Sequence, residues 1–295
     1  VVITEQGRGE IIKYFGQEYD FRVVKNGDSL SLGKHTLKFV PLPMLHWPDS
    51  MATYLEEEQI LFSNDAFGQH YSTNFKFDDE NDLSELLYEA KKYYANILMP
   101  FNKLVVKALD NLGLLPIRMI APSHGLIWRA HIADILSLYK KWSAGETDPL
   151  VLVVYDSMWG STEMMARRIL EGLTAGGIKA KLFRMADSDK SELIAELLTA
   201  RGLICGSSTL NNGMLPTMAA VLYYVKGLKP INKSGAAFGA YGWAGGAQAD
   251  MELALKAAGI EVAMTGPTLK WAPNQDEIQR CFEFGREFAE KMLNR

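Results

Sequence analysis

The chain has 295 residues, of which 48% are hydrophobic and 22% are charged, and its formal net charge is −4. A chain of this length can bury a large core and is long enough for two domains. No apolar run reaches the roughly 20 residues of a membrane span, and no signal-peptide pattern opens the chain, so we expect no membrane and a cytoplasmic location. The mild negative charge, without long basic clusters, disfavours nucleic acid as the main partner.

The chain contains two cysteines, Cys205 in the apolar run RGLICGS and Cys281 in a helical pattern. Two thiols in such positions cannot form a disulfide framework or a four-thiolate metal site. We therefore interpret both as buried thiols.

The first half of the chain mixes short strands with helices. The opening stretch VVITEQGRGEIIKYFG predicts a short strand that enters a helix, and residues 21–61 form a β-rich pattern of short alternating runs. Helices are expected at residues 82–96, 102–112 and 131–142, with a strand at IRMIAP before the last of them. The polar segment 143–149 predicts a boundary between a domain at residues 1–145 and a domain at residues 149–295.

Beyond this segment, strands and helices alternate regularly. The continuous apolar run LVLVVYDS is typical of a strand that is buried on both faces. Further strands are predicted at AKLFRM, GLICGSS, SGAAFGAYG and VAMTG, and a helix follows each strand. These units predict a five-stranded parallel sheet covered on both faces, with ligands beyond the carboxyl ends of its strands.

Three strand ends carry loops suited to a phosphate and a flat ring. SMWGST offers hydroxyls and a helix N-terminus, and because it lacks Lys and Arg it fits a monophosphate better than a triphosphate. SSTLNNG adds polar groups, and YGWAGG sets a tryptophan among glycines, where it can stack on a heterocycle. Each loop alone is more often a helix cap, but the three together favour a ligand. The candidate residues are Ser157, Met158, Trp159, Gly160, Ser161, Thr162, Ser207, Thr209, Leu210, Asn211, Asn212, Gly213, Tyr241, Gly242, Trp243, Ala244, Gly245 and Gly246.

The arrangement of these loops resembles flavodoxin. Ser157, Gly160 and Thr162 follow the T-x-T-G-x-T phosphate loop of that family, with Ser in the first place and Trp in the third. The resemblance covers about half of the chain and implies FMN, with its phosphate at the first loop.

Three polar residues of the first half each follow a strand-like run: His46 in LHWPDS, Asp65 in LFSNDAFG and His124 in APSHG. Two histidines and a carboxylate at strand ends suit a dinuclear metal site, because a carboxylate can bridge two hard cations. A single buried polar side chain is more often simply hydrogen-bonded within the fold. The spacing alone leaves both interpretations open.

The segments MLHWPDSM, SNDAFGQH, YYANILMPF and APSHGLIWR resemble those of the flavodiiron proteins, which join a metallo-β-lactamase-like domain to a flavodoxin domain. The resemblance covers essentially the whole chain. It implies an α/β two-domain fold, in which a partial metallo-β-lactamase-like αββα domain is followed by a flavodoxin-like five-stranded parallel sheet.

By motif position, the resemblance implies that His46 binds one iron, that His124 binds the other, and that Asp65 bridges both. The remaining histidines fall outside these positions and are interpreted as surface residues or neighbours of the ligands: His35, His70 and His131. The H-x-E-x-D-H segment of the family does not occur in this sequence. We expect that about one hundred residues of the family pattern are missing before Val1 and that they carry the remaining iron ligands; a chain without a complete diiron centre is the alternative.

The resemblance further implies an oxidoreductase in which FMN passes electrons to two non-haem irons, which reduce dioxygen to water, nitric oxide to nitrous oxide, or both. The electron donor would be a separate partner such as rubredoxin or a reduced deazaflavin, because no fused pair of C-x-x-C motifs occurs. A dinuclear zinc hydrolase with a fused flavodoxin domain and a flavodoxin-type electron carrier with an inert first domain are the alternatives.

The short linker between the domains bears on assembly. Seven residues span at most about 25 Å, which does not ensure that the flavin and the metals of one chain meet. In a head-to-tail homodimer, or a tetramer built from it, each flavin faces the metal site of a partner, as the family resemblance also implies.

Overall fold

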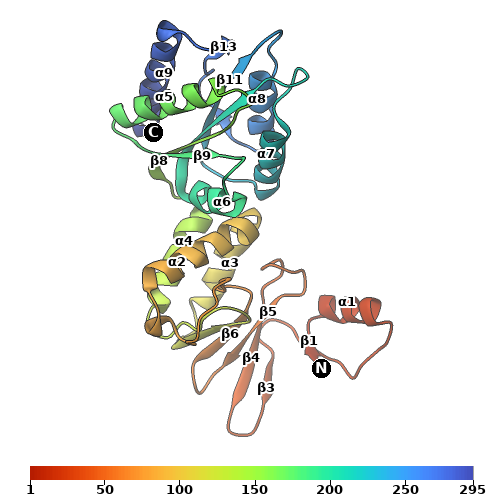
Figure 1. Cartoon of the computed structure of the whole chain (residues 1–295). Helices are drawn as coiled ribbons and strands as arrows, with labels where there is room; N and C mark the ends of the chain where they lie inside the picture. The colour runs from red at the N-terminus through yellow and green to blue at the C-terminus, as the bar shows by residue number, and fades with distance from the viewer. Residues whose placement is uncertain (295) are drawn as a thin grey trace. The chain divides into compact units, whose positions relative to one another are not determined.

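A computed structural model describes residues 1–294 (Figure 1). The chain divides into two compact units, one of residues 1–144 and one from Gly145 onward. The segment between them is shorter than the seven residues predicted, because α4 (Ile132–Ala144) contains its first two residues and β8 (Asp148–Asp156) its last two. The helix continues past its predicted end because Trp142 and Ser143 are buried and the Ser143 hydroxyl donates to the Lys140 carbonyl.

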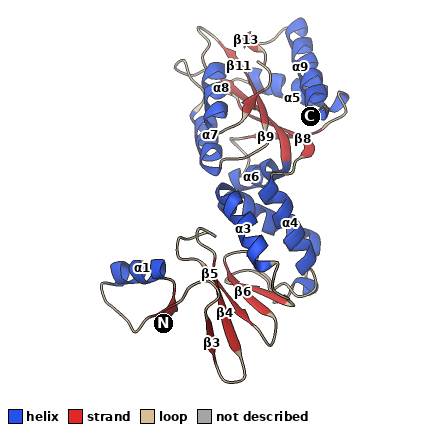
Figure 2. Ribbon diagram, turned by 180° about the vertical axis from the view of Figure 1, so that it is seen from behind, coloured by secondary structure: helices blue, strands red, loops and turns tan. Residues whose placement is uncertain are grey.

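The first unit opens as predicted, with β1 (Val2–Ile3) followed by α1 (Glu5–Phe15). The Thr4 hydroxyl caps the helix by accepting the N–H of Gly7 at 3.1 Å. Gly16 ends it in the left-handed conformation, with φ 69°. β1 pairs in parallel with β2 (Arg22–Val23), and both ribbon views show α1 standing apart from the other helices of this unit (Figures 1 and 2).

A five-stranded sheet follows in the order β3-β4-β5-β6-β7. Neighbouring strands are antiparallel except β6 and β7, which are parallel. β4 therefore runs in the same direction as β6 and β7, and the loops that follow these three strands share one edge of the sheet. The strands are β3 (Ser29–Ser31), β4 (Thr36–Pro41), β5 (Met51–Leu55), β6 (Ile60–Asn64) and β7 (Met119–Pro122).

Helical segments connect β6 to β7 and follow β7. A 3₁₀ turn (Asp78–Glu80) leads into α2 (Leu83–Tyr93), which continues as a π-helical segment (Tyr94–Leu98) and a second 3₁₀ turn (Met99–Phe101). The helix predicted at 82–96 is therefore α-helical only as far as Tyr93 and continues as a π-helical segment. Such π-helical segments are frequent near functional sites. α3 (Asn102–Leu112) has the predicted bounds.

The fully buried carboxylate of Asp78 fixes the chain that follows β7. It accepts the backbone N–H groups of Arg129, Ala130 and His131 at 2.7–3.2 Å. Burying a carboxylate is costly unless hydrogen bonds satisfy it, and here the loop before α4 supplies them. The loop that carries His124 is therefore anchored at its far end.

The second unit holds a parallel sheet in the order β12-β11-β10-β8-β9, with β13 also pairing with β11. The fifth strand, predicted at VAMTG, is split: β12 ends at Val262, and β13 takes up the pairing after Pro267, which has no N–H to donate. Besides β8, the strands of this sheet are β9 (Lys179–Arg184), β10 (Ala200–Ser208), β11 (Ser234–Tyr241), β12 (Glu261–Val262) and β13 (Thr268–Lys270).

Helices cover both faces of this sheet (Figure 2). Right-handed crossovers place α5 and α9, which pack together, on one face and α6, α7 and α8 on the other. The chain moves from β8 outward to β9 and then returns to the other side of β8, so the strand order reverses at β8, where α/β sheets bind ligands. The helices are α5 (Ser161–Ala175), α6 (Lys190–Thr199), α7 (Pro216–Leu228), α8 (Ala247–Ala257) and α9 (Gln275–Leu293).

Both thiols are buried, as predicted, and burial raises the pKa of Cys205 to about 12 and that of Cys281 to about 11. In the part of the chain that the structure describes, no helix is long and apolar enough to cross a bilayer. The cytoplasmic location stays a prediction.

Candidate metal and flavin sites

The structure brings His46, Asp65 and His124 together at the shared edge of the first sheet. His46 Nε2 lies 3.5 Å from one carboxylate oxygen of Asp65, and His124 Nε2 lies 3.6 Å from the other. The carboxylate therefore stands between two imidazoles, as a bridging ligand would. Within residues 1–294 no three His, Cys, Asp or Glu side chains converge on one metal position, so each candidate position receives one imidazole and one carboxylate oxygen from this chain.

Hydrogen bonds between the three loops hold this arrangement. The Ser123 hydroxyl donates to Asp65 at 2.9 Å, and the Ser123 N–H donates to the Asn64 carbonyl at 2.8 Å. Asn64 has a positive φ of 57°, and its amide reaches the Ser50 hydroxyl, which accepts the N–H of Trp47 at 3.1 Å. The loop of His46 is thereby tied to the loops of Asp65 and His124.

The ring of His124 is oriented by its neighbours in SNDAFGQH. Its Nδ1 lies 3.2 Å from the Gln69 carbonyl, so Nδ1 donates and Nε2, facing Asp65, carries the lone pair that a metal ligand needs. The ring also packs on Gly68, where a Cβ atom would lie only 2.6 Å from its Cε1. A glycine at position 68 is therefore a condition for this ring position.

Gln69 joins the loop after β6 to the loop after β7. Its side chain is fully buried, donates to the carbonyls of Phe67 and Leu126 at 3.1 and 3.3 Å, and accepts the Leu126 N–H at 2.7 Å. Gln69 was not among the predicted site residues, although the family-like segment SNDAFGQH contains it.

Two further side chains, Tyr93 and His70, lie beside His124. The ring centroids of Tyr93 and His124 are 4.9 Å apart, and His70 lies 5.0 Å from Tyr93 and 5.2 Å from His124. Partial burial first, and the proximity of His124 second, lower the pKa of His70. His70 is thus a neighbour of a predicted ligand, whereas His35 and His131 pair with Glu57 and Asp134.

Tyr93 carries an unused hydroxyl. The residue is 3% exposed, and its hydroxyl has no hydrogen-bond partner among the described residues. Burial first, and the charge of Asp65 second, raise the pKa of Tyr93 far above its ordinary value, so the hydroxyl keeps its proton. Tyr93 opens the family-like segment YYANILMPF but was not among the predicted site residues.

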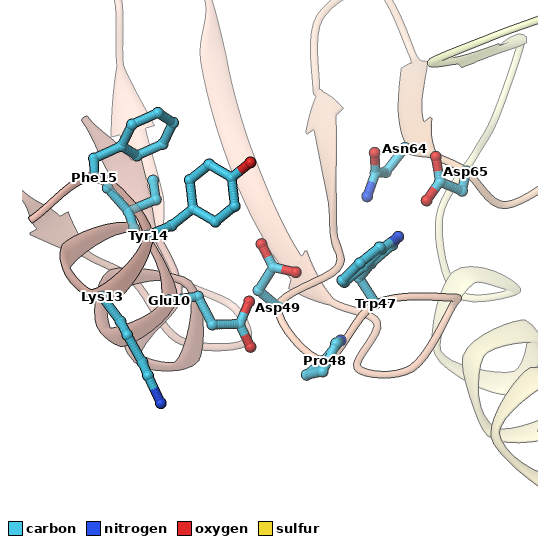
Figure 3. A pocket seen from close by; sticks show the side chains of 10 residues that line it. Glu10, Lys13, Tyr14, Phe15, Trp47, Pro48, Asp49, Asn64 and Asp65 are labelled. Atoms are coloured by element: carbon cyan, nitrogen blue, oxygen red, sulfur yellow. The ribbon is translucent and has the colours of Figure 1, made fainter.

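Asp65 is reached from an open pocket of about 920 Å³ (Figure 3). Trp47, which is 61% exposed, lines it together with Asp65, while Glu10 and Tyr14 of α1 form the opposite wall. A small substrate can therefore approach the carboxylate without a change in the fold.

The three predicted flavin loops also come together, because they follow strands that are neighbours in the second sheet. The Ser208 hydroxyl accepts the N–H of Met158 at 3.2 Å and lies 3.0 Å from the Thr162 hydroxyl. The N–H of Thr209 donates to the Ala240 carbonyl at 2.8 Å, which joins the second loop to the third. Ser208 lies in the predicted loop SSTLNNG but was not among the individually named candidates, although it makes the connection.

Ser207 lies in this region but faces inward. Ser207 is fully buried. Its hydroxyl donates to the Ser208 carbonyl at 2.8 Å and accepts the N–H of Leu215 at 2.9 Å. Its side chain therefore shapes the loop before α7. A direct contact between Ser207 and a ligand stays a prediction.

The first loop presents an uncapped helix N-terminus. Gly160 precedes α5 with φ 87°, and no side chain caps the helix there. The Ser157 hydroxyl accepts the Gly160 N–H at 3.0 Å and shapes the turn, and a Cβ atom at Gly160 would meet nothing within 4 Å. Free amides at the start of a 15-residue helix, beside hydroxyls and open space, fit a phosphate.

The surface around these loops is aromatic. Trp159 is 89% exposed and Trp243 is 90% exposed. Gly246 has φ 152°, and a Cβ atom there would run into the Asn212 carbonyl, so the second and third loops approach each other closely. Two exposed indoles next to closely packed loops can stack on a flat ring. Such a ring would lie beside the phosphate loop.

Two family models match the chain, Flavodoxin over residues 153–285 and the ODP family beta lactamase over residues 1–125. A protein named nitric oxide reductase from Moorella thermoacetica is 49% identical over 94% of this chain and 70% of its own length. The chain belongs to the flavodiiron protein family. The anaerobic nitric oxide reductase flavorubredoxin of Escherichia coli is 45% identical, and the chain spans 58% of it.

Solved structures of this family share the fold. The rubredoxin oxygen:oxidoreductase of Desulfovibrio gigas matches with a TM-score of 0.96 and 33% identity, over 99% of this chain and 74% of that one. The flavodiiron protein of Giardia intestinalis matches with a TM-score of 0.96 and 35% identity, over 99% and 73%. These matches confirm the predicted two-domain fold, the family, and FMN with non-haem iron as its cofactors.

Gly68→Ala should displace His124. The added methyl group has to push the imidazole away from Asp65, and we expect a loss of about tenfold or more in metal affinity, as for other groups that orient ligands. The measurement is iron content after dialysis against a graded chelator. Gly9→Ala, at a helix position where a Cβ meets nothing, is the matched control and should keep its iron.

Ser161→Ala and Thr162→Ala should each weaken FMN binding. A hydrogen bond to a phosphate contributes roughly 1.5–3 kcal/mol, which corresponds to about 10- to 100-fold in the dissociation constant. Fluorescence titration of the apoprotein with FMN measures the change. Thr174→Ala, near the other end of α5, is the control, and unchanged affinity in both loop variants would place the phosphate elsewhere.

Proposed function

We propose that the intact protein reduces dioxygen to water, nitric oxide to nitrous oxide, or both, with FMN and two non-haem irons supplying the redox chemistry when bound. The observation that carries this proposal is the Asp65 carboxylate between two imidazoles in a chain that also bears a flavodoxin phosphate loop. The relatives support both substrates, because one is named nitric oxide reductase and another rubredoxin oxygen:oxidoreductase. The chain is thus proposed to act as an oxidoreductase.

In this proposal His46 and His124 would each hold one metal, and the Asp65 carboxylate would contact both. The Ser123 hydroxyl keeps the carboxylate in place, and the Gln69 carbonyl keeps His124 in the ligand tautomer. This chain would supply one imidazole and one carboxylate oxygen to each metal position.

Tyr93 is proposed to serve as a proton-holding group beside the metals. Its hydroxyl stays protonated, lacks a partner and lies on the ring that packs against His124. A buried unpaired donor costs free energy, and it regains a partner when an acceptor occupies the site. Tyr93 therefore favours a substrate or product that accepts a hydrogen bond there.

The electron donor is proposed to be a separate carrier such as rubredoxin or a reduced deazaflavin. The name of the Desulfovibrio gigas structure mentions rubredoxin for that protein. In the second unit the exposed Trp159 and Trp243 leave the flavin loops open to a partner.

We also propose a head-to-tail homodimer, or a tetramer built from it. Three residues connect α4 to the first residue of β8. The first flavin loop follows the last residue of β8, at the opposite end of this strand. Nine residues of strand separate these ends by about 30 Å, while α4 leads about 20 Å away from the loop of His124. In a head-to-tail pair the flavin loops of one chain would meet the edge of the other chain that carries Asp65.

Asp65→Ala tests the metal site. If the carboxylate bridges, the variant should lose both irons, whereas His46→Ala and His124→Ala should each lose one preferentially. Metal analysis of the purified intact protein measures this, with His35→Ala as a control. Retention of two irons and full activity in Asp65→Ala would contradict the bridging role.

The same metal analysis of the unaltered protein separates the alternatives. About two irons per chain support the proposal. Two zinc ions would support a hydrolase instead, and an intact protein that never takes up metal would support a simple flavodoxin-type carrier.

Tyr93→Phe should lower the turnover rate by about 10- to 100-fold, the range seen for groups that surround a metal site. The hydroxyl makes no hydrogen bond within the fold, so the thermal unfolding temperature should stay the same or rise. Stopped-flow reduction of dioxygen and of nitric oxide measures the effect. An unchanged rate with both substrates would remove Tyr93 from the mechanism.

Mixing two inactive variants tests the dimer. One lacks flavin (Ser161→Ala with Thr162→Ala) and the other lacks metal (Asp65→Ala). Heterodimers place one flavin against one intact metal site, so unfolding and refolding the mixture should restore part of the activity. A monomer by light scattering that works at full rate, or mixed dimers without recovery, would contradict the head-to-tail assembly.

A further inference from the structure

Trp271, in the segment TLKWAPN, lies beside the third flavin loop and belongs to none of the motifs described above. β13 pairs in parallel with the end of β11, where Lys270 lies opposite Tyr241. The N–H of Trp271 donates to the Tyr241 carbonyl at 2.9 Å and extends this ladder by one residue. The short strand therefore brings Trp271 to the point where YGWAGG begins.

The backbone of Trp271 is held in an unfavourable conformation. Its φ is 64°, a left-handed value that is uncommon for any residue with a bulky side chain. Such residues persist where the surrounding structure imposes them, often at ligand sites. Here Gln248 of α8 anchors the segment, since its amide donates to the carbonyls of Ala237 and Gly266 and accepts the Thr268 hydroxyl.

The ring of Trp271 packs against Gly242 and Trp243 of the third flavin loop. A Cβ atom at Gly242 would lie 2.9 Å from Cζ3 of Trp271, so the indole covers this glycine. The Trp271 and Trp243 ring centroids are 5.8 Å apart with an interplanar angle of 57°, within the range of an aromatic pair. Trp271 is 59% exposed and Trp243 is 90% exposed, so both rings keep open faces.

We propose that Trp271 is a positioning residue of the flavin site, which holds Gly242 and Trp243 in the arrangement that receives the isoalloxazine ring of FMN. This inference rests on the proposed FMN site. An otherwise exposed Trp243 has to be ordered when FMN binds, and ordering it beforehand lowers that cost. The left-handed backbone is maintained because β13 and Gln248 fix the segment that leads into Trp271, and the Trp271 N–H is itself bonded to the Tyr241 carbonyl.

Trp271→Gly and Trp271→Phe test the proposal in the full chain. Glycine accepts the φ of 64° without strain, so the first variant removes the ring and leaves the backbone free to keep its course. We expect it to weaken FMN binding about three- to tenfold and to raise the fluorescence of the bound flavin. Trp271→Phe, which keeps a ring, should restore most of both properties.

Gly242→Ala is a second variant that leaves Trp271 in place but pushes its indole away from the loop, and it should have the same effects. Tyr223→Ala removes an exposed ring from α7 and is the control. The readouts are fluorescence titration of the apoprotein with FMN, the fluorescence of the bound flavin, and its visible circular dichroism.

The outcomes separate the inference from the function on which it rests. If the unaltered chain binds FMN and Trp271→Gly has the same affinity, fluorescence and dichroism, or binds FMN more tightly, Trp271 is not a positioning residue. If the unaltered chain itself does not bind FMN, the proposed flavin site is wrong and the inference is overturned with it.

Discussion

The parallel pairing of β6 with β7 is the constraint on which the first site depends. Parallel strands present their carboxyl ends at one edge, so Asp65 and His124, which are 59 residues apart in the printed sequence, follow adjacent strand ends. The loop of His46 follows β4 at the same edge, because the antiparallel β5 carries the chain to the opposite edge and β6 then returns in the direction of β4. Without that pairing, the carboxylate and the two imidazoles would have no reason to meet.

Buried polar groups make this edge specific. Gln69 satisfies three backbone groups from two loops, and Asp78 satisfies three N–H groups beyond His124. Each buried group would cost free energy if it lost its partners, so the loops have little freedom to separate. The ring of His124 is then held over Gly68, with its Nε2 facing Asp65.

In the second unit, adjacent parallel strands also bring their loops together, but these loops carry different chemical groups. Adjacent parallel strands place three loops side by side, and hydroxyls and backbone groups connect them at Ser208 and Thr209. The donors in these loops are uncharged, which suits a monophosphate at the start of α5. One unit therefore groups a carboxylate with two imidazoles, a set that suits metals, while the other groups amides, hydroxyls and indoles, a set that suits a flavin.

Local patterns and motifs predicted the two-domain fold class, most of the helices and strands, and the placement of His46, Asp65 and His124 at strand ends. Those predictions depend on local patterns, because apolar periodicity, turn residues and short motifs are properties of neighbouring residues. The split of the fifth strand was missed because VAMTG has the composition of a strand, while Pro267 and the pairing of β13 with β11 decide where the ladder continues. The short linker was predicted, but too long, because α4 extends through Ala144 and β8 already begins at Asp148.

Only the tertiary structure placed Tyr93, Gln69 and Trp271. None of them stands out in its own segment, since a tyrosine on a helix, a glutamine in a loop and a tryptophan after a strand are common. Their roles arise from distant partners: the ring of His124, the backbone of Leu126 and the glycine at position 242. Contacts between segments far apart in the chain form only on folding, so local sequence patterns determine which residues can take part and the fold decides which of them meet.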